Sequence, residues 1–200
     1  MKNAPGLLPY SLLTAQSSLL IKRSVLPSPP PNPIRMARHS RQHLIAFEEL
    51  DTVTDLTPAE QTTWQAARDA TNHSYAPYSG FHVGAALLLA DGTIFRGTNQ
   101  ENAAYPSGLC AERTALFGLA AAQPGHAPIV GMAVAARPSD GDFGPAFPCG
   151  ACRQVMLEYE SRQSQAISLL LPGRNGNILR FGSLSAIMPF NFSPDDLPAA

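Results

Sequence analysis

The chain has 200 residues, of which 44% are hydrophobic and 14% charged, so it can bury the core of one domain of ordinary size. Its formal net charge of −1 at pH 7 argues against a general binder of nucleic acids or membrane surfaces. Three cysteines are too few for a disulfide framework and no apolar run reaches the roughly 18 residues of a membrane span, so we expect a soluble, cytoplasmic protein.

Residues 1–45 are expected to form a tail that is basic and rich in proline. Residues 1–40 contain five lysines or arginines, seven prolines and no acidic residue, whereas residues 41–200 carry nine bases and fifteen acids. Five of those prolines fall within one run of seven residues, which favours an extended chain over a helix. The composition fits a disordered tail, a true translation start at Met36, a targeting segment or a partner-binding arm. We expect the folded domain to comprise residues 46–200.

The remainder of the chain alternates helix and strand signals. Thr57 and Pro58 suit the cap and the first position of a helix, with Trp64 and Ala67 on its inner face. Asp91-Gly92, between two apolar runs, predicts a hairpin. In chain order we expect a helix over 58–73, strands over 81–90 and 93–97, a helix over 111–122, a strand over 128–137, a helix over 150–162, strands over 166–171 and 178–181, and a short helix over 184–188.

This order of elements predicts an α/β fold. Apolar strands that alternate with helices bury both faces of a sheet, so we expect a three-layer α/β/α sandwich. Two of the expected connections are hairpin-like, after residues 90 and 171, and a hairpin joins antiparallel strands. The sheet should therefore be mixed, with about five strands.

The three cysteines are the most informative residues for chemistry, because each lies near the expected start of a helix. Cys149 and Cys152 form a Cys-x-x-Cys pair after Pro148, and Cys110 directly precedes the helix over 111–122. A helix N-terminus favours thiolate over thiol, and zinc prefers thiolate ligands. No histidine lies close to them in the sequence, so three sulfurs would leave a fourth position open, as in a catalytic zinc site. A redox pair, a structural zinc site and plain core cysteines are the alternatives.

Glu112 favours the catalytic alternative. It lies two residues after Cys110, in the first turn of the same expected helix, where its carboxylate can face the open position without being a ligand. Zinc lowers the pKa of water to about 7, and a neighbouring carboxylate can take that proton and pass it to a substrate nitrogen. An acid in a first helical turn can also serve only to complement the helix dipole. Its combination with three cysteines makes a catalytic site the better interpretation.

These motifs resemble those of the zinc-dependent cytidine deaminases, specifically their small homotetrameric type. Cys110-Ala-Glu-Arg113 and Pro148-Cys-Gly-Ala-Cys-Arg-Gln154 carry the resemblance. Further matching segments are Tyr75–Ser79, Phe81–Ala86, Asn99–Ala103, Tyr105-Pro106 and Pro189–Leu197. The resemblance extends from about residue 60 to residue 197 and leaves residues 1–45 uncovered.

The resemblance implies that the domain over 46–200 is catalytic and deaminates cytidine and deoxycytidine to uridine and deoxyuridine, releasing ammonia, in pyrimidine salvage. It implies a zinc ion, a nucleoside substrate and a homotetramer with shared active sites. The net charge and the lack of an apolar span predict neither nucleic acid nor a membrane as partner. The roles that the resemblance implies are zinc ligands at Cys110, Cys149 and Cys152, a proton shuttle at Glu112, a ring against the pyrimidine at Phe81, ribose contacts at Asn99 and Glu101, a backbone contact to the base carbonyl at Ala111, a neighbouring subunit's pocket at Phe192, and a subunit interface at Tyr78.

The charge at such a metal needs an explanation. Zinc with three thiolates has a net charge of −1, which would acidify water less well than a site with neutral ligands. Two helix N-termini, worth about half a positive charge each, point toward the metal and offset this charge. We also expect Arg113 and Arg153, each one residue after a candidate site residue, to donate hydrogen bonds to the sulfurs from outside the ligand set.

Departures from the family pattern leave the exact substrate open. Gln100, Ala104 and Phe147 are unusual at their positions, and the loop over 140–147 is somewhat long. None removes a reacting group, so they allow a shifted preference among pyrimidine nucleosides. One alternative is an enzyme for another cytosine-like compound, such as an aminopyrimidine antibiotic or a base in a polynucleotide, although the net-acidic domain lacks a basic stripe. Another is a binding module with a structural zinc or redox site, which gives Glu112 no role.

Overall fold

The structure is a computed structural model of the chain and describes residues 39–163 and 165–198. The chain divides into two units, residues 1–41 and 42–200, and every element described below belongs to the second. The expectation of a disordered tail or a non-native start falls mainly on residues 1–38, which lie outside the described residues.

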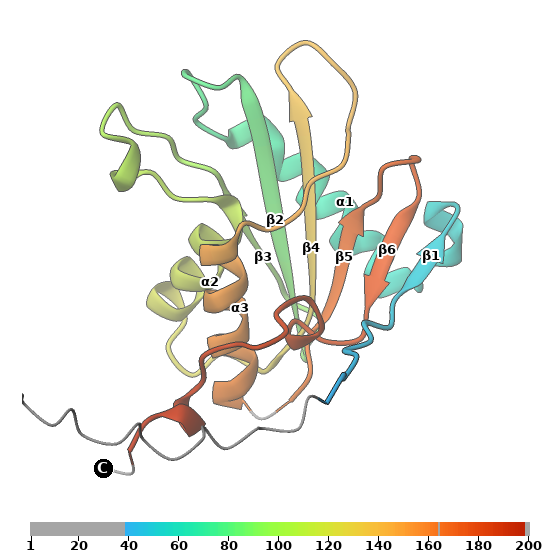
Figure 1. The fold of residues 1–200 in the computed structure, drawn as a ribbon. Helices are drawn as coiled ribbons and strands as arrows, with labels where there is room; N and C mark the ends of the chain where they lie inside the picture. The colour runs from blue at the N-terminus through green and yellow to red at the C-terminus, as the bar shows by residue number, and fades with distance from the viewer. Residues whose placement is uncertain (1–38, 164, 199–200) are drawn as a thin grey trace, which may run out of the picture. The chain divides into compact units, whose positions relative to one another are not determined.

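A mixed sheet of six strands organises the second unit (Figure 1). Its strands are β1 (Glu48–Leu50), β2 (Phe81–Leu89), β3 (Ile94–Thr98), β4 (Ile129–Pro138), β5 (Ser168–Pro172) and β6 (Ile178–Phe181). Their spatial order is β1-β6-β5-β4-β2-β3, with β4 and β5 parallel and the other neighbours antiparallel. The α/β prediction and the mixed sheet are confirmed, but the expected count of about five strands is one too low.

The additional strand is β1, which no sequence pattern predicts because its residues, Glu-Glu-Leu, are neither apolar nor alternating. Contacts with distant residues hold it at the edge of the sheet. The guanidinium of Arg180 on β6 forms an ion pair with Glu48, and its Nη1 lies 3.2 Å from the Glu60 carboxylate. The ring of Phe47 stacks on that of Phe181, with centroids 5.4 Å apart. Tertiary contacts therefore supply what local propensity lacks.

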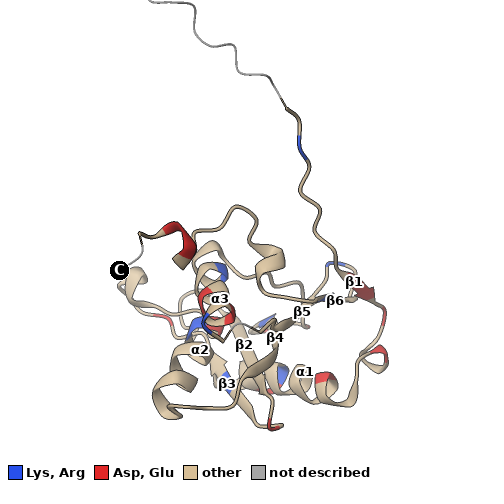
Figure 2. Cartoon of the chain, turned by 90° about the horizontal axis from the view of Figure 1, so that it is seen from below, with Lys and Arg blue, Asp and Glu red and all other residues tan. Residues whose placement is uncertain are grey.

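Three α-helices cover the two faces of the sheet, namely α1 (Pro58–Ala70), α2 (Ala111–Ala122) and α3 (Gly150–Gln163). Figure 2, which looks along the strands, shows α1 on one face and α2 and α3 on the other, so the three-layer sandwich is confirmed. Charged residues of both signs are interspersed along these helices. None of the helices in the described ranges has the length and apolar character needed to cross a membrane.

The core has two parts, one on each side of the sheet. Trp64 and Ala67 of α1 are buried against Ala86 of β2, as predicted for the inner face of this helix. Ala85 and Leu87 of the same strand belong to the other part, with α2 and α3. Neighbouring residues of β2 thus point into opposite cores, which explains why nearly every position of this strand is apolar.

The strand directions bring several loops to one end of the sheet. Because β2 is antiparallel to β3 and β4, and β4 is parallel to β5, the start of β2 lies beside the ends of the other three. The chain that leaves β3 and β4 at this end leads into α2 and α3. Gly97 lets α2 pack closely on β3, since a Cβ there would lie 2.3 Å from the Ala115 nitrogen. This end of the sheet holds the candidate site.

Candidate active site

The three cysteines predicted as metal ligands lie together where α2 and α3 begin. Cys110 is the N-cap residue of α2, Cys149 directly precedes α3, and Cys152 lies in the first turn of α3. Cys149 Sγ lies 4.0 Å from Cys110 Sγ and 3.5 Å from Cys152 Sγ. All three sulfur atoms lie within 4.8 Å of one another, and none of the three forms a disulfide.

These separations fit one zinc ion. Sulfur atoms about 2.3 Å from a tetrahedral zinc lie about 3.8 Å from each other. Within residues 39–163 and 165–198, no histidine, aspartate or glutamate joins the cluster. Three thiolates are also a donor set that zinc prefers, so the cysteines fit a zinc ion that keeps one coordination position for another molecule.

The pKa values of two thiols in this cluster are shifted in opposite directions. A hydrogen bond from the Cys152 thiol, and then the guanidinium of Arg113, lower the pKa of the Cys110 thiol to about 5. The Cys152 thiol donates that hydrogen bond and is also buried, and both effects raise its pKa. The cluster without a metal therefore already favours a thiolate at Cys110, the form that binds zinc.

Glu112 is the buried carboxyl group of this site. Its residue is 4% exposed, yet it lines the same cavity as Cys110 and Cys149. Burial raises the pKa of the Glu112 carboxyl, and the negative sulfur of Cys110 raises it further. A carboxyl group whose pKa is shifted toward neutrality can both accept and release a proton.

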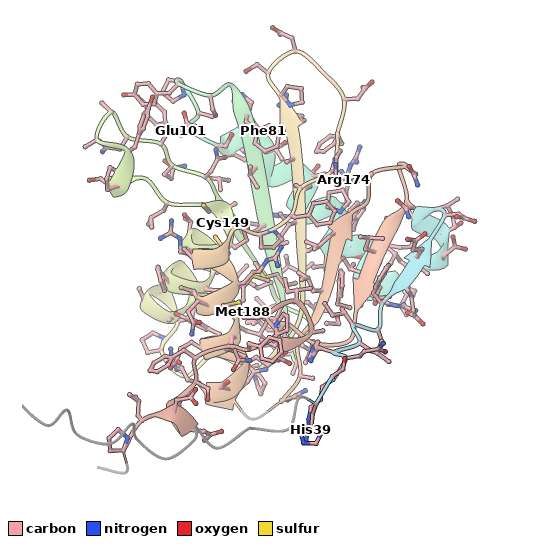
Figure 3. All side chains as sticks on the ribbon, viewed as in Figure 1. His39, Phe81, Glu101, Cys149, Arg174 and Met188 are labelled. Atoms are coloured by element: carbon pink, nitrogen blue, oxygen red, sulfur yellow. The ribbon has the colours of Figure 1, made fainter. Side chains whose placement is uncertain are left out.

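The cavity has a volume of about 770 Å³ and connects the sulfur cluster with the predicted nucleoside residues. Phe81, Asn99 and Glu101 line it, and Figure 3 shows Phe81 and Glu101 at the same end of the sheet as Cys149. Ala111 is buried at the first position of α2 and is not among the residues that line the cavity. Phe192 is 58% exposed and lies outside this cavity.

Asn99 is held in place by the backbone of β2. Its Oδ1 accepts a hydrogen bond from the nitrogen of Val83 at 2.8 Å, and its Nδ2 donates to the carbonyl of Phe81 at 2.8 Å. An amide oxygen accepts two hydrogen bonds and an amide nitrogen donates two, so one of each remains for a ligand. The side chain is therefore oriented before any ligand binds.

Glu101 is fixed by the turn that precedes β2. Its carboxylate accepts hydrogen bonds from the nitrogens of Tyr78 at 2.9 Å and Ser79 at 3.2 Å, and from the Ser79 hydroxyl. The Ser79 hydroxyl, followed by the Tyr78 N–H, lowers the pKa of the Glu101 carboxyl and keeps it ionised. The sequence does not predict this role of Ser79, because a serine in a Tyr-Ser-Gly turn has no feature that separates it from an ordinary turn residue.

The two arginines expected to contact the sulfurs behave differently. Arg113 Nη2 lies 3.9 Å from Cys110 Sγ, at the long end of hydrogen bonds to sulfur. Arg153 instead donates from Nε to the carbonyl of Pro148 at 2.9 Å and from Nη1 to that of Ile187 at 3.0 Å. The expected bond from Arg153 to sulfur is not formed, because the guanidinium is directed to these two backbone carbonyls instead. Arg153 positions the residue before Cys149.

We expect Arg113→Ala to release zinc about 10-fold or more faster to a chelator, since loss of a group that supports a ligand typically costs about 10–100-fold in metal affinity or activity. The measurement is zinc transfer to a coloured chelator, with the deamination rate recorded on the same sample. Arg113→Lys should recover part of the effect because it restores the charge. Arg96→Ala, which removes an exposed arginine of β3, is the control. Wild-type zinc retention and rate in Arg113→Ala would show that the charge account is wrong.

Comparisons with known proteins point to one family. The family model described as "Cytidine and deoxycytidylate deaminase zinc-binding region" matches residues 58–167. A cytidine deaminase of Sporosarcina psychrophila is 40% identical over 134 residues, which cover 67% of this chain and 91% of the relative. One of Halalkalibacterium halodurans is 41% identical over 131 residues, which cover 66% and 92%.

Solved structures give the same result for the fold. The crystal structure of cytidine deaminase from Burkholderia pseudomallei matches with a TM-score of 0.57 and 40% identity, over 68% of this chain and all of that chain. The structure of the enzyme from Mycobacterium tuberculosis matches with a TM-score of 0.52 and 31% identity, over 67% and 97%. The family model begins at residue 58, so β1 precedes the matched region.

Proposed function

Since this chain belongs to the zinc-dependent cytidine deaminase family, we propose that it hydrolyses cytidine and deoxycytidine to uridine and deoxyuridine and releases ammonia, in pyrimidine salvage. Zinc dependence and hydrolytic deamination follow from family membership. The observation that carries the proposal for this chain is the buried carboxyl of Glu112, which lines one cavity with two sulfurs of the Cys110, Cys149 and Cys152 cluster. A structural zinc site or a redox site would give such a buried acid no role.

The nucleoside would lie in the cavity between two groups of residues. Asn99 and Glu101 would bind the ribose hydroxyls, since an amide and a carboxylate offer the donors and acceptors that two neighbouring hydroxyls need. Phe81, which is 42% exposed in the cavity, would pack against the pyrimidine ring. The N–H of Ala111 at the start of α2 would donate to the base carbonyl. These contacts direct C4 of the base toward the sulfur cluster.

Cys110, Cys149 and Cys152 would hold the zinc ion, which when bound supplies a water molecule acidified for attack. Glu112 takes one proton from that water and delivers it to N3 while the C4–O bond forms. The second proton of the water then passes through Glu112 to the exocyclic amine. The C4–N bond breaks, ammonia leaves, and the C4 carbonyl of uridine remains. One carboxyl group thus serves first as base and then as acid.

We also propose that the enzyme is a cytoplasmic homotetramer with shared active sites. Phe192 supports this, because its ring is 58% exposed while its carbonyl is fixed by the side-chain amide of Gln154 at 2.8 Å. Tyr78, at the mouth of the cavity, is 50% exposed. The ring of Phe192 would enter the pocket of a neighbouring subunit. The ring of Tyr78 would be covered at a subunit interface. Light scattering after size exclusion tests the assembly, and a strict monomer would contradict it.

The function is tested by assaying purified enzyme with cytidine, deoxycytidine, a cytosine-containing oligonucleotide and an aminopyrimidine antibiotic. The loss of ultraviolet absorbance should match ammonia release. We expect turnover of the two nucleosides and none of the oligonucleotide, since residues 41–200 carry nine bases and fifteen acids and so offer little attraction to a polynucleotide. Turnover of the antibiotic alone would favour the second candidate substrate class, and turnover of neither nucleoside would contradict the proposal.

Glu101→Gln should raise KM for cytidine more than it lowers kcat. The neutral amide loses the charge that binds the ribose hydroxyls and the Ser79 turn, and a hydrogen bond to a charged group corresponds to about 10–100-fold in kcat/KM. Steady-state kinetics measures the split between the two constants. Glu158→Gln, at an exposed position of α3, is the matched control. An unchanged KM in Glu101→Gln would remove Glu101 from the binding site.

A further inference from the structure

One wall of the cavity is built by the loop between β4 and α3, residues 139–149. Pro145, Ala146 and Phe147 line the cavity, and only Pro148 separates them from Cys149. The side chain of Phe147 is the largest of the three, and its residue is 43% exposed. A bulky ring therefore faces the cavity two residues before a sulfur of the cluster.

The loop is held at four points, so this wall is a fixed one. The guanidinium carbon of Arg68 on α1 lies 3.7 Å from the ring centroid of Phe143. The nitrogen of Gly144 donates to the carbonyl of Ala136 at 3.0 Å, and Arg153 binds the carbonyl of Pro148. The fourth contact involves Phe147 itself.

The ring of Phe147 is covered by an arginine from another part of the chain. The guanidinium carbon of Arg174 lies 5.7 Å from its centroid, within the range of a cation–π contact. Arg174 belongs to the turn between β5 and β6, which is closed by a hydrogen bond from the Gly173 nitrogen to the Asn177 carbonyl at 2.8 Å. Figure 3 shows Arg174 at the same end of the sheet as Cys149 and Phe81.

The orientation of the base, which rests on the proposed function, decides what this ring meets. With C4 at the sulfur cluster, the base carbonyl and N3 point to Ala111 and Glu112 on α2. The C5–C6 edge lies on the other side of the pyrimidine ring and so points away from α2. Because C5 is bonded to C4, a substituent on C5 lies only two bonds from the reacting C4 and must meet a wall close to the sulfurs. The Pro145–Phe147 wall has that position.

We infer that Phe147 determines specificity by packing against the C5 edge of the pyrimidine, and that Arg174 is a positioning residue that fixes the Phe147 ring. The pocket should accept cytosine with hydrogen at C5 and oppose a methyl group there. An extra methyl group changes specificity in a hydrophobic pocket by about 10–200-fold, so an effect on this scale is expected.

The test compares kcat/KM for 5-methylcytidine with that for cytidine, using zinc-loaded full-length enzyme. Phe147→Ala should raise the ratio of the two constants about 10-fold or more, with a higher KM for cytidine. Arg174→Gln should raise the ratio less, and Arg174→Lys should restore it, since lysine keeps a cation over the ring. Arg162→Gln is the control, because Arg162 covers the ring of Tyr159 at 4.9 Å, outside the cavity.

The outcomes separate this inference from the proposed function. No turnover of cytidine by the wild-type enzyme would overturn the proposed function and the inference with it. Turnover of cytidine with an unchanged ratio in folded Phe147→Ala would overturn the inference alone. Phe147→Leu, which keeps an apolar side chain, replaces Phe147→Ala if thermal denaturation shows that the alanine variant does not fold. If Arg162→Gln changed the ratio of kcat/KM for 5-methylcytidine to that for cytidine as much as Arg174→Gln does, Arg174 would not be a positioning residue for Phe147.

Discussion

Glu112→Gln is expected to retain zinc and lose about 10³-fold or more of kcat on cytidine, a loss within the range typical of general acid–base groups. Glutamine has the same shape, so it fits the site where Glu112 is only 4% exposed. It can neither take a proton from water nor give one to N3 or the amine. The binding contacts at the ribose are untouched, so KM should change far less than kcat.

The measurement pairs zinc content with steady-state turnover on the same preparation. Retained zinc with lost turnover supports a proton shuttle, whereas lost zinc would make Glu112 a ligand or a structural support of the cluster. Glu112→Asp shortens the side chain by one methylene and keeps the acid, so it should retain more activity than the glutamine variant. Turnover of Glu112→Gln at the wild-type rate would contradict the role given to this residue.

Cys149→Ala is expected to abolish both zinc binding and turnover, the second large effect. It removes one of three sulfurs, and loss of a direct ligand should exceed the about 10–100-fold cost of losing an outer partner. Cys149 is the exposed member of the cluster, so its replacement should disturb the fold least, whereas Cys152 is buried in the core. Zinc content after gel filtration and turnover with added zinc are the measurements.

Thermal denaturation of Cys149→Ala separates loss of metal from loss of fold. Cys149→Ser offers an oxygen in place of sulfur and should bind zinc more weakly than the wild type, with partial recovery of turnover at high zinc. If Cys149→Ala kept one zinc per chain, the cluster would not be the metal site. If it lost zinc but kept turnover, the metal would be structural rather than catalytic.

Local patterns predict most of the fold but not its edge. The long apolar runs of β2 and β4 predict buried strands, and Thr57 with Pro58 predicts the start of α1, where Thr57 Oγ1 accepts from the Glu60 nitrogen as an N-cap should. β1 has no such signal, because it depends on Arg180, about 130 residues further along the chain. A pattern within a short window cannot contain that partner.

The candidate site shows the same division. The spacing of the cysteines and Glu112 could be recognised because those residues fall in two short segments at the starts of two helices. The hydrogen-bond acceptors of Arg153 could not be predicted from the sequence, because one of them, the carbonyl of Ile187, lies in a turn 34 residues further along the chain. The contact of Arg174 with Phe147 is likewise tertiary. Groups defined by motif are predictable from sequence, whereas the contacts that orient them depend on the complete fold.

X-ray absorption at the zinc edge, recorded on zinc-loaded enzyme without nucleoside, tests the central claim most directly. Three sulfur atoms at about 2.3 Å and one lighter atom at about 2.0 Å are predicted, because three cysteines are to leave one position for water. In Cys149→Ala this spectrum should disappear with the metal. Four sulfur ligands, or a histidine nitrogen in the fourth position, would contradict an open catalytic site.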